Sequence, residues 1–134
     1  MSIVEYALKF IGKPYVWAGN GPTGFDCSGL VIECLQAFGK LPAGDWSADT
    51  LSAKLVLVGW KPVSDVQEGD LLFYGSKKFT HVAMAINDWQ VVEAGGGGSR
   101  CISPETSTGI VRVRPLTWRR PNLILRENKE TLSV

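Results

Sequence analysis

A helix that begins with a cysteine constrains this chain more than any other feature of its sequence. After a loop rich in Gly, Pro and Asn, apolar or small residues recur at the spacing of a helix with one buried face, at Cys27, Leu30, Val31, Cys34, Leu35 and Phe38. Gly39 follows as a typical C-terminal stop. The thiol of Cys27 is therefore expected at a helix N-terminus, where the helix dipole and unpaired backbone N–H groups favour the nucleophilic thiolate. Such a position is typical of a catalytic cysteine.

The remaining pattern predicts helices first and strands afterwards. Ser2 and Glu5 form a capping box for a first helix, whose apolar stripe runs to Ile11 and which Gly12 ends. A third helix is capped by Ser47 and carries Leu51, Leu55 and Val58. Strands are predicted at 60–63, 70–74, 81–86, 90–94, 110–116 and 123–125. This order favours an α+β domain, with N-terminal helices packed on an antiparallel β-sheet, over a βαβ fold.

The length of 134 residues suits one domain, which we expect to span residues 1–126 with a polar tail at 127–134 that frays. No internal repeat or linker divides the chain. Because the capping box follows directly on Met1, we expect a complete small protein without a signal peptide.

Charge and cysteine content exclude several classes of function. The net charge of +1 gives no general affinity for nucleic acid, and no run of residues is long and apolar enough to span a membrane. Arg112 and Arg114 alternate with valine and are interpreted as the solvent-facing side of a strand. Three cysteines exclude a complete disulfide framework, although Cys34 and Cys101 could pair. Since no Cys-x-x-Cys spacing is present, no metal site and no cofactor are expected.

A nucleophilic cysteine needs a base, and the sequence offers one histidine, His81, at the start of a predicted strand. Glu93 lies twelve positions further on, in the next predicted strand. Both side chains share one face of the sheet only if an odd number of residues forms the hairpin loop, such as 87–89. We expect the odd loop, so that Glu93 accepts a hydrogen bond from the imidazole. A two-residue turn would leave Glu93 on the opposite face, and a water-exposed carboxylate is the alternative role.

Other polar residues near Cys27 have less specific patterns. Tyr15 is a candidate to donate its hydroxyl to an oxyanion, beside a backbone N–H of the helix start, or else it is an ordinary packed aromatic. Asp26 and Ser28 are candidates for the helix cap or for binding substrate. We also expect Trp46 to line the substrate groove.

Four blocks of sequence resemble the NlpC/P60 family of cell-wall cysteine peptidases. They are the runs from Gly12 to Gly19 (GKPYVWAG), Phe25 to Val31 (FDCSGLV), Gly69 to Phe73 (GDLLF) and His81 to Ile86 (HVAMAI). The resemblance extends from the first helix to Glu93. It implies a papain-like α+β fold, with Cys27 as nucleophile, His81 as base and Tyr15 shaping the oxyanion site. Ala18 departs from the family's usual glycine, and Glu93 occupies the third polar position, where the family most often has histidine.

The resemblance implies hydrolysis of amide bonds in peptidoglycan stem peptides, often between D-glutamate and a diamino acid, in the cell wall or periplasm. Family members usually carry a secretion signal, so we expect either an excised catalytic domain or, as the intact capping box favours, a small protein that a phage tail or a secretion apparatus delivers. Two neighbouring functions remain open. A CHAP-type amidase also uses Cys, His and an acidic residue, and an acyltransferase would use the same thioester. A catalytically idle tail or wall-binding component is the alternative from another class, and the presence of both Cys27 and His81 argues against it.

Overall fold

The computed structural model describes residues 1–16, 19, 24–95 and 109–128. Three helices precede the strands: α1 (Ile3–Leu8), α2 (Cys27–Ala37) and α3 (Ala48–Leu57). The strands are β1 (Lys61–Pro62), β2 (Leu71–Tyr74), β3 (His81–Ala85), β4 (Gln90–Gly95), β5 (Ile110–Pro115) and β6 (Leu123–Arg126), with a 3-10 helix, η2 (Leu116–Trp118), before the last strand. These elements confirm the predicted order of helices and strands.

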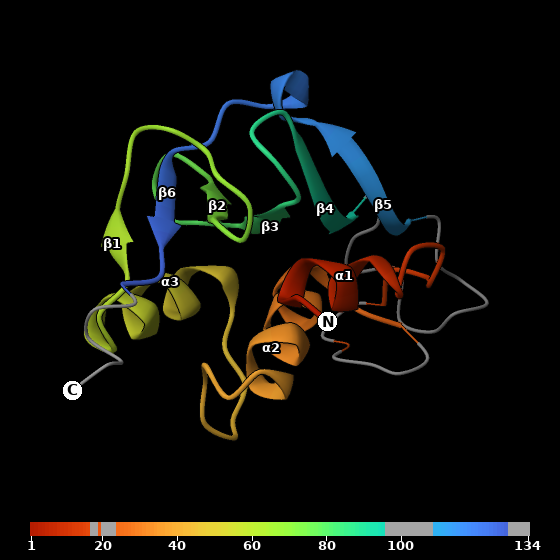
Figure 1. Ribbon diagram of the computed structural model, residues 1–134, viewed down its shortest axis with the longest axis horizontal. Coiled ribbons are helices and arrows are strands. Elements are labelled where there is room, and N and C mark those ends of the chain that lie inside the picture. The colour runs from red at the N-terminus through yellow and green to blue at the C-terminus, as the bar shows by residue number, and fades with distance from the viewer. Residues whose placement is uncertain (17–18, 20–23, 96–108, 129–134) are drawn as a thin grey trace.

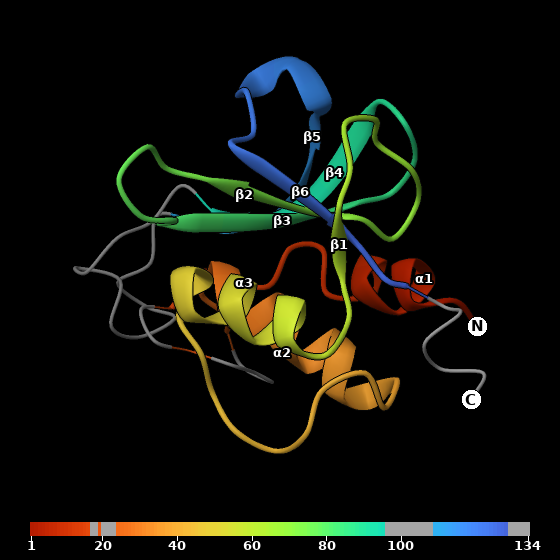
Figure 2. The ribbon, with the colours of Figure 1, turned by 90° about the vertical axis from the view of Figure 1, so that its left-hand side faces the viewer.

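The strands form one sheet with the order β1-β6-β2-β3-β4-β5, in which every pair of neighbours is antiparallel. The three helices lie on one side of this sheet, whereas η2 lies on the other (Figures 1 and 2). The predicted α+β class, with helices packed on an antiparallel sheet, is thereby confirmed. No helix in the described part of the chain has the length and apolar character needed to cross a bilayer.

The first helix is shorter than predicted. Its capping box of Ser2 and Glu5 is present, but the helix ends at Leu8 and Ile11 is 48% exposed. The chain leaves the helix because its next residues join β5: the N–H of Gly12 donates to the carbonyl of Val111 at 2.9 Å. Gly12 adopts a φ of 91°, a left-handed conformation that glycine tolerates without strain. Pairing with β5 thus outweighs the helical periodicity that reaches Ile11.

The other two helices begin where the sequence predicts. Asp26 caps α2, and Ser47 forms a capping box with Thr50 at the start of α3. Gly39 follows α2 with a φ of 69°, as expected of a C-terminal stop. Val58 was expected on the buried face of the third helix, yet it is 40% exposed, because it lies at the C-cap beyond the last turn.

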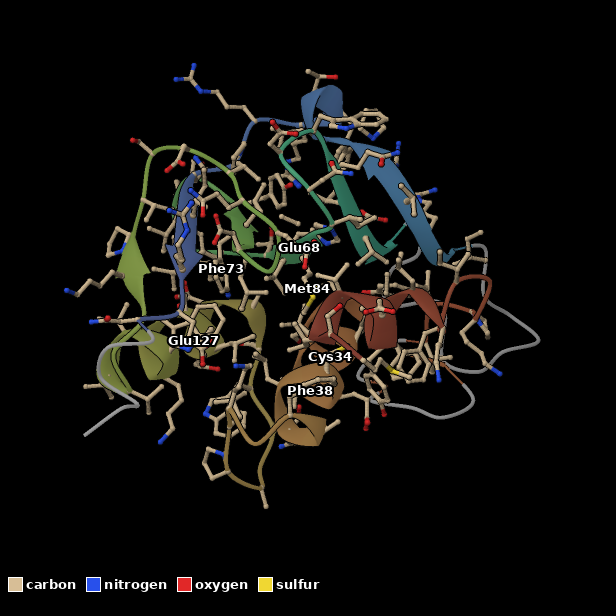
Figure 3. The ribbon with its side chains drawn as sticks, in the orientation of Figure 1. Cys34, Phe38, Glu68, Phe73, Met84 and Glu127 are labelled. Atoms are coloured by element: carbon tan, nitrogen blue, oxygen red, sulfur yellow. The ribbon has the colours of Figure 1, made fainter. Side chains whose placement is uncertain are left out.

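The main core fills the space between the helices and the sheet. Phe73 and Met84 extend from the sheet into this space, and Cys34 faces it from α2 (Figure 3). Burial raises the pKa of the Cys34 thiol to about 12, so Cys34 is a small buried hydrophobe, as predicted. Its possible partner Cys101 lies outside the described residues.

A second, smaller core covers the opposite face of the sheet. It consists of Leu72, Tyr74, Ala83, Ala85 and Val91, with Leu116 and Trp118 packed against them. The two small alanines of β3 leave room for this layer, as the alternation along the strand predicts. His81 belongs to the same alternation, and its ring packs beside Tyr74 and Trp118 with centroid separations of 5.6 and 5.9 Å. The sheet therefore presents His81 at the edge of this second core.

Candidate active site

Cys27 is the first residue of α2, and the backbone around it is held firmly. The carboxylate of Asp26 accepts a hydrogen bond from the N–H of Gly29 at 2.6 Å, which caps the helix. Phe25 is fully buried, and its backbone N–H donates to the carbonyl of Pro14 while its carbonyl accepts from the N–H of Val16. The residue Cys27 is 8% exposed, and its Sγ lies 3.8 Å from the carbonyl oxygen of Thr80. This contact places the sulfur beside the residue that precedes His81.

The start of β3 is fixed from two sides. The N–H of Thr80 donates to the carbonyl of Tyr74 at 2.9 Å, which ties it to β2. The N–H of Phe79 donates to the carboxylate of Asp49 at 3.0 Å, which ties it to the first turn of α3. His81 follows as the first residue of the strand, with its side chain 13% exposed. The imidazole thus projects from a rigid position next to the N-terminus of α2.

Glu93 lies where the odd-loop prediction put it. Met84 pairs with Val92 and Ala85 with Val91, and the N–H of Ile86 donates to the carbonyl of Gln90. These pairs leave residues 87–89 as a three-residue loop, which brings His81 and Glu93 to one face. His81 Nε2 and Glu93 Oε1 are 2.9 Å apart, and Glu93 is 1% exposed. The alternative of a water-exposed carboxylate is wrong.

Arg112 is the polar partner that the sequence did not reveal. Its Nε donates to the second oxygen of Glu93, Oε2, at 3.0 Å, and the two residues are direct neighbours across β4 and β5. The interpretation of Arg112 as a simple solvent-facing residue is therefore wrong. The signal available in the sequence was the alternation of β5, which puts one arginine opposite Glu93 once the strand register is known. The sequence alone does not fix that register, because many residues separate the two strands in the chain.

The charges of this cluster shift the pKa values of its members. Burial lowers the pKa of His81, but hydrogen bonds with Cys27 and Glu93, and the charges of both, outweigh burial and raise the pKa to about 9. Since Nε2 faces Glu93, Nδ1 is the ring nitrogen left for Cys27. Burial raises the pKa of Glu93, yet hydrogen bonds and charges from His81 and Arg112 reverse that effect and keep it below its usual value. The cluster favours an imidazolium beside an ionised Glu93.

The remaining candidates occupy more varied positions. Asp26 caps the helix and accepts a long hydrogen bond of 3.4 Å from Ser28, which is buried. Tyr15 is buried and pairs through its backbone with Phe25, two residues before Cys27. Trp46 is half-buried in the segment between α2 and α3, where it packs beside Gly44 and the main core. Roles for these residues toward a substrate stay predictions. Ala18 lies outside the described residues. Within the described residues, no three or more side chains of His, Cys, Asp or Glu are grouped so that they could hold a metal ion.

Chemically, the arrangement joins a thiol at a helix N-terminus, an imidazole and a carboxylate in one chain of contacts. The imidazole can take the thiol proton, the carboxylate stabilises the resulting imidazolium, and the first helical turn offers N–H groups to a developing oxyanion. Tyr74 and Trp118 pack on the imidazole and limit its exposure to water. These are the parts required for acyl transfer through a thioester.

Comparison with known proteins finds a matching family model, relatives in sequence and solved structures with the same fold. The family model for NlpC/P60 matches residues 12–116. Protein P54 of Enterococcus faecium is 37% identical over 123 residues, which cover 90% of this chain and 21% of the relative. The peptidoglycan endopeptidase RipA of Mycolicibacterium smegmatis is 31% identical and is matched over 81% of this chain and 24% of its own length.

The crystal structure of the NlpC/p60 domain of the peptidoglycan hydrolase SagA superposes with a TM-score of 0.69 at 34% identity, covering 92% of this chain and 95% of that domain. The chain spans only a fifth to a quarter of the length of the two curated relatives named above. The match of the family model to most of the chain, together with this superposition, leads to one conclusion: the chain belongs to the NlpC/P60 family.

Proposed function

We propose that this protein is a cysteine endopeptidase that hydrolyses amide bonds in the stem peptides of peptidoglycan. The observation that carries the proposal is the placement of three groups: Cys27 Sγ lies 3.8 Å from the carbonyl oxygen of Thr80, the residue directly before His81, and His81 Nε2 lies 2.9 Å from Glu93 Oε1. Cys27 and Glu93 both raise the pKa of His81. Relatives named peptidoglycan endopeptidases support the substrate class. A relative in Bacillus subtilis, 31% identical over 81% of this chain, is named gamma-D-glutamyl-L-lysine dipeptidyl-peptidase. That name supports a bond between D-glutamate and a diamino acid as the one cleaved.

In the acylation step, Cys27 attacks the carbonyl carbon of the scissile amide as a thiolate, and a carbon–sulfur bond forms. The proton that the thiol gave up resides on Nδ1 of His81. We assign the oxyanion to the backbone N–H groups of the first turn of α2, together with the hydroxyl of Tyr15. The imidazolium then protonates the leaving amine, the carbon–nitrogen bond breaks, and a thioester remains.

In the deacylation step, neutral His81 removes a proton from water, and the hydroxide attacks the thioester. Collapse of the tetrahedral intermediate breaks the carbon–sulfur bond, releases the carboxylic acid and leaves the Cys27 thiolate beside the protonated His81. Glu93 keeps its negative charge throughout, because its task is to orient His81 and to stabilise the imidazolium. This assignment follows the thiol-protease pattern with a carboxylate as the third residue.

Digestion of purified muropeptides tests the proposal. Native protein and Cys27→Ala are incubated with muropeptides that carry either lysine or diaminopimelate, and the fragments are identified by mass. We expect the native protein to release fragments that end in D-glutamate and Cys27→Ala to release none. Absence of fragments from every wall type would overturn the endopeptidase assignment.

The same experiment separates the neighbouring functions. A CHAP-type amidase would free the intact stem peptide from the sugar rather than cut within it. An acyltransferase would yield a new amide when an amine acceptor is added in excess, and an idle scaffold would yield neither product. The ion pair of His81 and Glu93 beside Cys27 favours an active enzyme over the idle scaffold.

Delivery by a phage tail or a secretion apparatus, and action in the cell wall or periplasm, stay predictions from the sequence. Mass spectrometry of purified virions and of the secreted fraction would test them. Detection in either fraction supports delivery, whereas confinement of the protein to the producing cytoplasm contradicts it.

A further inference from the structure

Glu93 is the most constrained polar side chain in the active site. It is 1% exposed, and both of its carboxylate oxygens have partners: Oε1 faces His81 Nε2 at 2.9 Å and Oε2 accepts from Arg112 Nε at 3.0 Å. A buried carboxylate with two independent donors has a fixed orientation, because rotation would break one of the two hydrogen bonds. The proposed mechanism uses only the bond to His81 and leaves Arg112 without a role.

The space around the carboxylate carries a second, independent observation. Gly95 lies two residues further along β4, on the same face of the strand as Glu93. A methyl group at Gly95 would lie 2.5 Å from Glu93 Oε2 and 2.7 Å from Oε1, closer than van der Waals contact allows. Gly95 does not adopt a positive φ, so its backbone conformation alone does not require glycine. Space for the carboxylate is therefore what glycine provides at this position.

We propose that Arg112 and Gly95 are positioning residues of the active site, which together hold the Glu93 carboxylate against His81. The inference rests on the proposed function, because it assigns parts to the same site. Arg112 donates to one oxygen and directs the other toward the imidazole. Gly95 leaves the volume that this orientation occupies. Neither residue contacts the reacting thiol, so both act through Glu93.

The arginine also balances charge in a place where water is excluded. Among the described residues, the titratable groups that face His81 are Cys27 from α2, Tyr74 from β2 and Glu93 from β4, and Arg112 adds its charge from β5 through Glu93. Burial raises the pKa of Tyr74 to about 12, so Tyr74 stays neutral. When His81 gives its proton to a leaving amine, Arg112 is the remaining cation beside Glu93. The carboxylate therefore keeps a charged partner throughout the catalytic cycle.

The first test is spectroscopic and needs no substrate. His81 is the sole histidine, so in tag-free protein labelled with ¹⁵N-histidine both ring N–H resonances belong to it, and couplings within the ring distinguish Nε2–H from Nδ1–H. A hydrogen bond to a fixed carboxylate protects this proton from exchange with water, and we expect a resolved resonance in the native protein. Arg112→Gln and Gly95→Ala should each lose or broaden it. Arg112→Lys, which keeps the charge and one donor, should retain it in part, and the exposed Arg120→Gln serves as the matched control.

The second test is kinetic and asks whether Arg112 acts through Glu93. We expect Arg112→Gln to lower kcat about ten- to a hundredfold with little change in KM. A loss of this size is typical when a residue that orients a functional side chain by a hydrogen bond is removed. In a Glu93→Ala background the same substitution should have no further effect, since the group that Arg112 holds is gone. Thermal melting of each variant establishes that it is folded, and Gly95→Ala, which leaves Arg112 in place, gives a second route to the same displacement.

A native Nε2–H resonance that survives both Arg112→Gln and Gly95→Ala would overturn the proposal. So would an equal loss of kcat from Arg112→Gln with and without Glu93, because Arg112 would then act on the substrate directly. If the native protein cleaves no muropeptide, the proposed function fails while the resonance still decides the positioning role. The two failures are thereby distinguishable.

Discussion

Two buried carboxylates, Asp70 and Glu93, differ in what surrounds them, although each is 1% exposed and each bonds an arginine. Asp70 precedes β2 at the end of the β2–β3 pair that lies away from His81. It accepts two hydrogen bonds from Arg126, at 2.9 and 2.8 Å, and one from the N–H of Gln67 at 2.8 Å. All of these donors keep their protons at physiological pH. The hydrogen bonds around Asp70 therefore do not change with pH in this range, and they stabilise this end of the sheet.

Glu93 has one partner that titrates. Its arginine resembles that of Asp70, but the second donor is the imidazole of His81, which also contacts a thiol. The same type of buried ion pair thus serves stability at one end of the sheet and, under the proposed function, supports proton transfer at the other. What distinguishes the two regions is the placement of one histidine and one cysteine. The comparison predicts that substitutions at the two carboxylates separate stability from activity.

The largest expected effect is the loss of activity in Cys27→Ala, which should exceed about a thousandfold because the nucleophile is removed. Cys34→Ala is the matched control, since Cys34 is a buried thiol of the same helix that faces the core. We expect Cys34→Ala to lower the melting temperature and to retain kcat. Hydrolysis of a defined muropeptide and thermal melting measure both. Equal activity of the two variants would break the distinction between a reactive and a structural thiol.

Asp70→Asn should destabilise the fold by about 3 kcal/mol, because it leaves Arg126 without its buried counter-ion. We expect kcat to stay within about twofold of the native value, since the hydrogen bonds described for Asp70 join it to Gln67, Ala85 and Arg126 and not to Cys27, His81 or Glu93. Urea unfolding and steady-state kinetics check the two statements. A large loss of kcat in folded Asp70→Asn would contradict the assignment of this end of the sheet to structure alone.

Glu93→Gln should show the opposite pattern. An amide has one acceptor oxygen, so its NH₂ group must oppose the donor of either His81 or Arg112. We expect kcat to fall about ten- to a hundredfold, with a smaller loss of stability than in Asp70→Asn. The pair of variants forms a direct comparison when both are assayed by kinetics and urea unfolding. If Glu93→Gln proves as active as the native protein, the carboxylate has no part in catalysis.

The pH dependence of stability sharpens the same comparison. The pKa of His81 is raised from 6.5 to about 9, so its stabilisation is fully present below pH 6.5 and is lost as the pH rises through 9. The pKa of Glu93 is lowered, so its contribution is present above about pH 4.5 and is lost as the pH falls through the lowered value. Between pH 6.5 and 9.5 we expect native stability to fall by on the order of 2 kcal/mol more than that of His81→Gln, measured by urea unfolding. Parallel profiles of the two proteins would contradict the raised pKa.

Much of this architecture could be predicted because its signals are local. The caps at Ser2, Asp26 and Ser47 and the alternation along the strands depend on residues close in sequence, and they placed almost every element. The side of the sheet on which Glu93 lies followed from the odd number of residues in the short loop between β3 and β4. These features need no knowledge of distant contacts.

The predictions that proved wrong depend instead on contacts between residues far apart in the sequence. The first helix ends early because Gly12 pairs with Val111, almost a hundred residues away in the chain. Arg112 was misinterpreted because its partner depends on the register of β4 and β5, which no local pattern fixes. Periodicity describes which face a residue occupies, but it does not reveal which strand lies next to it. The polar partners of an active site are therefore harder to predict than its nucleophile.

The most direct test of the central claim is the NMR titration of His81 in the native protein and in Cys27→Ala. If the thiol of Cys27 and the imidazole of His81 form one catalytic unit, the native pKa is near 9 and falls clearly when the sulfur is removed, because Cys27 is one of the two partners that raise it. An identical His81 pKa in both proteins would show that the two groups do not interact, and it would contradict the account at its foundation.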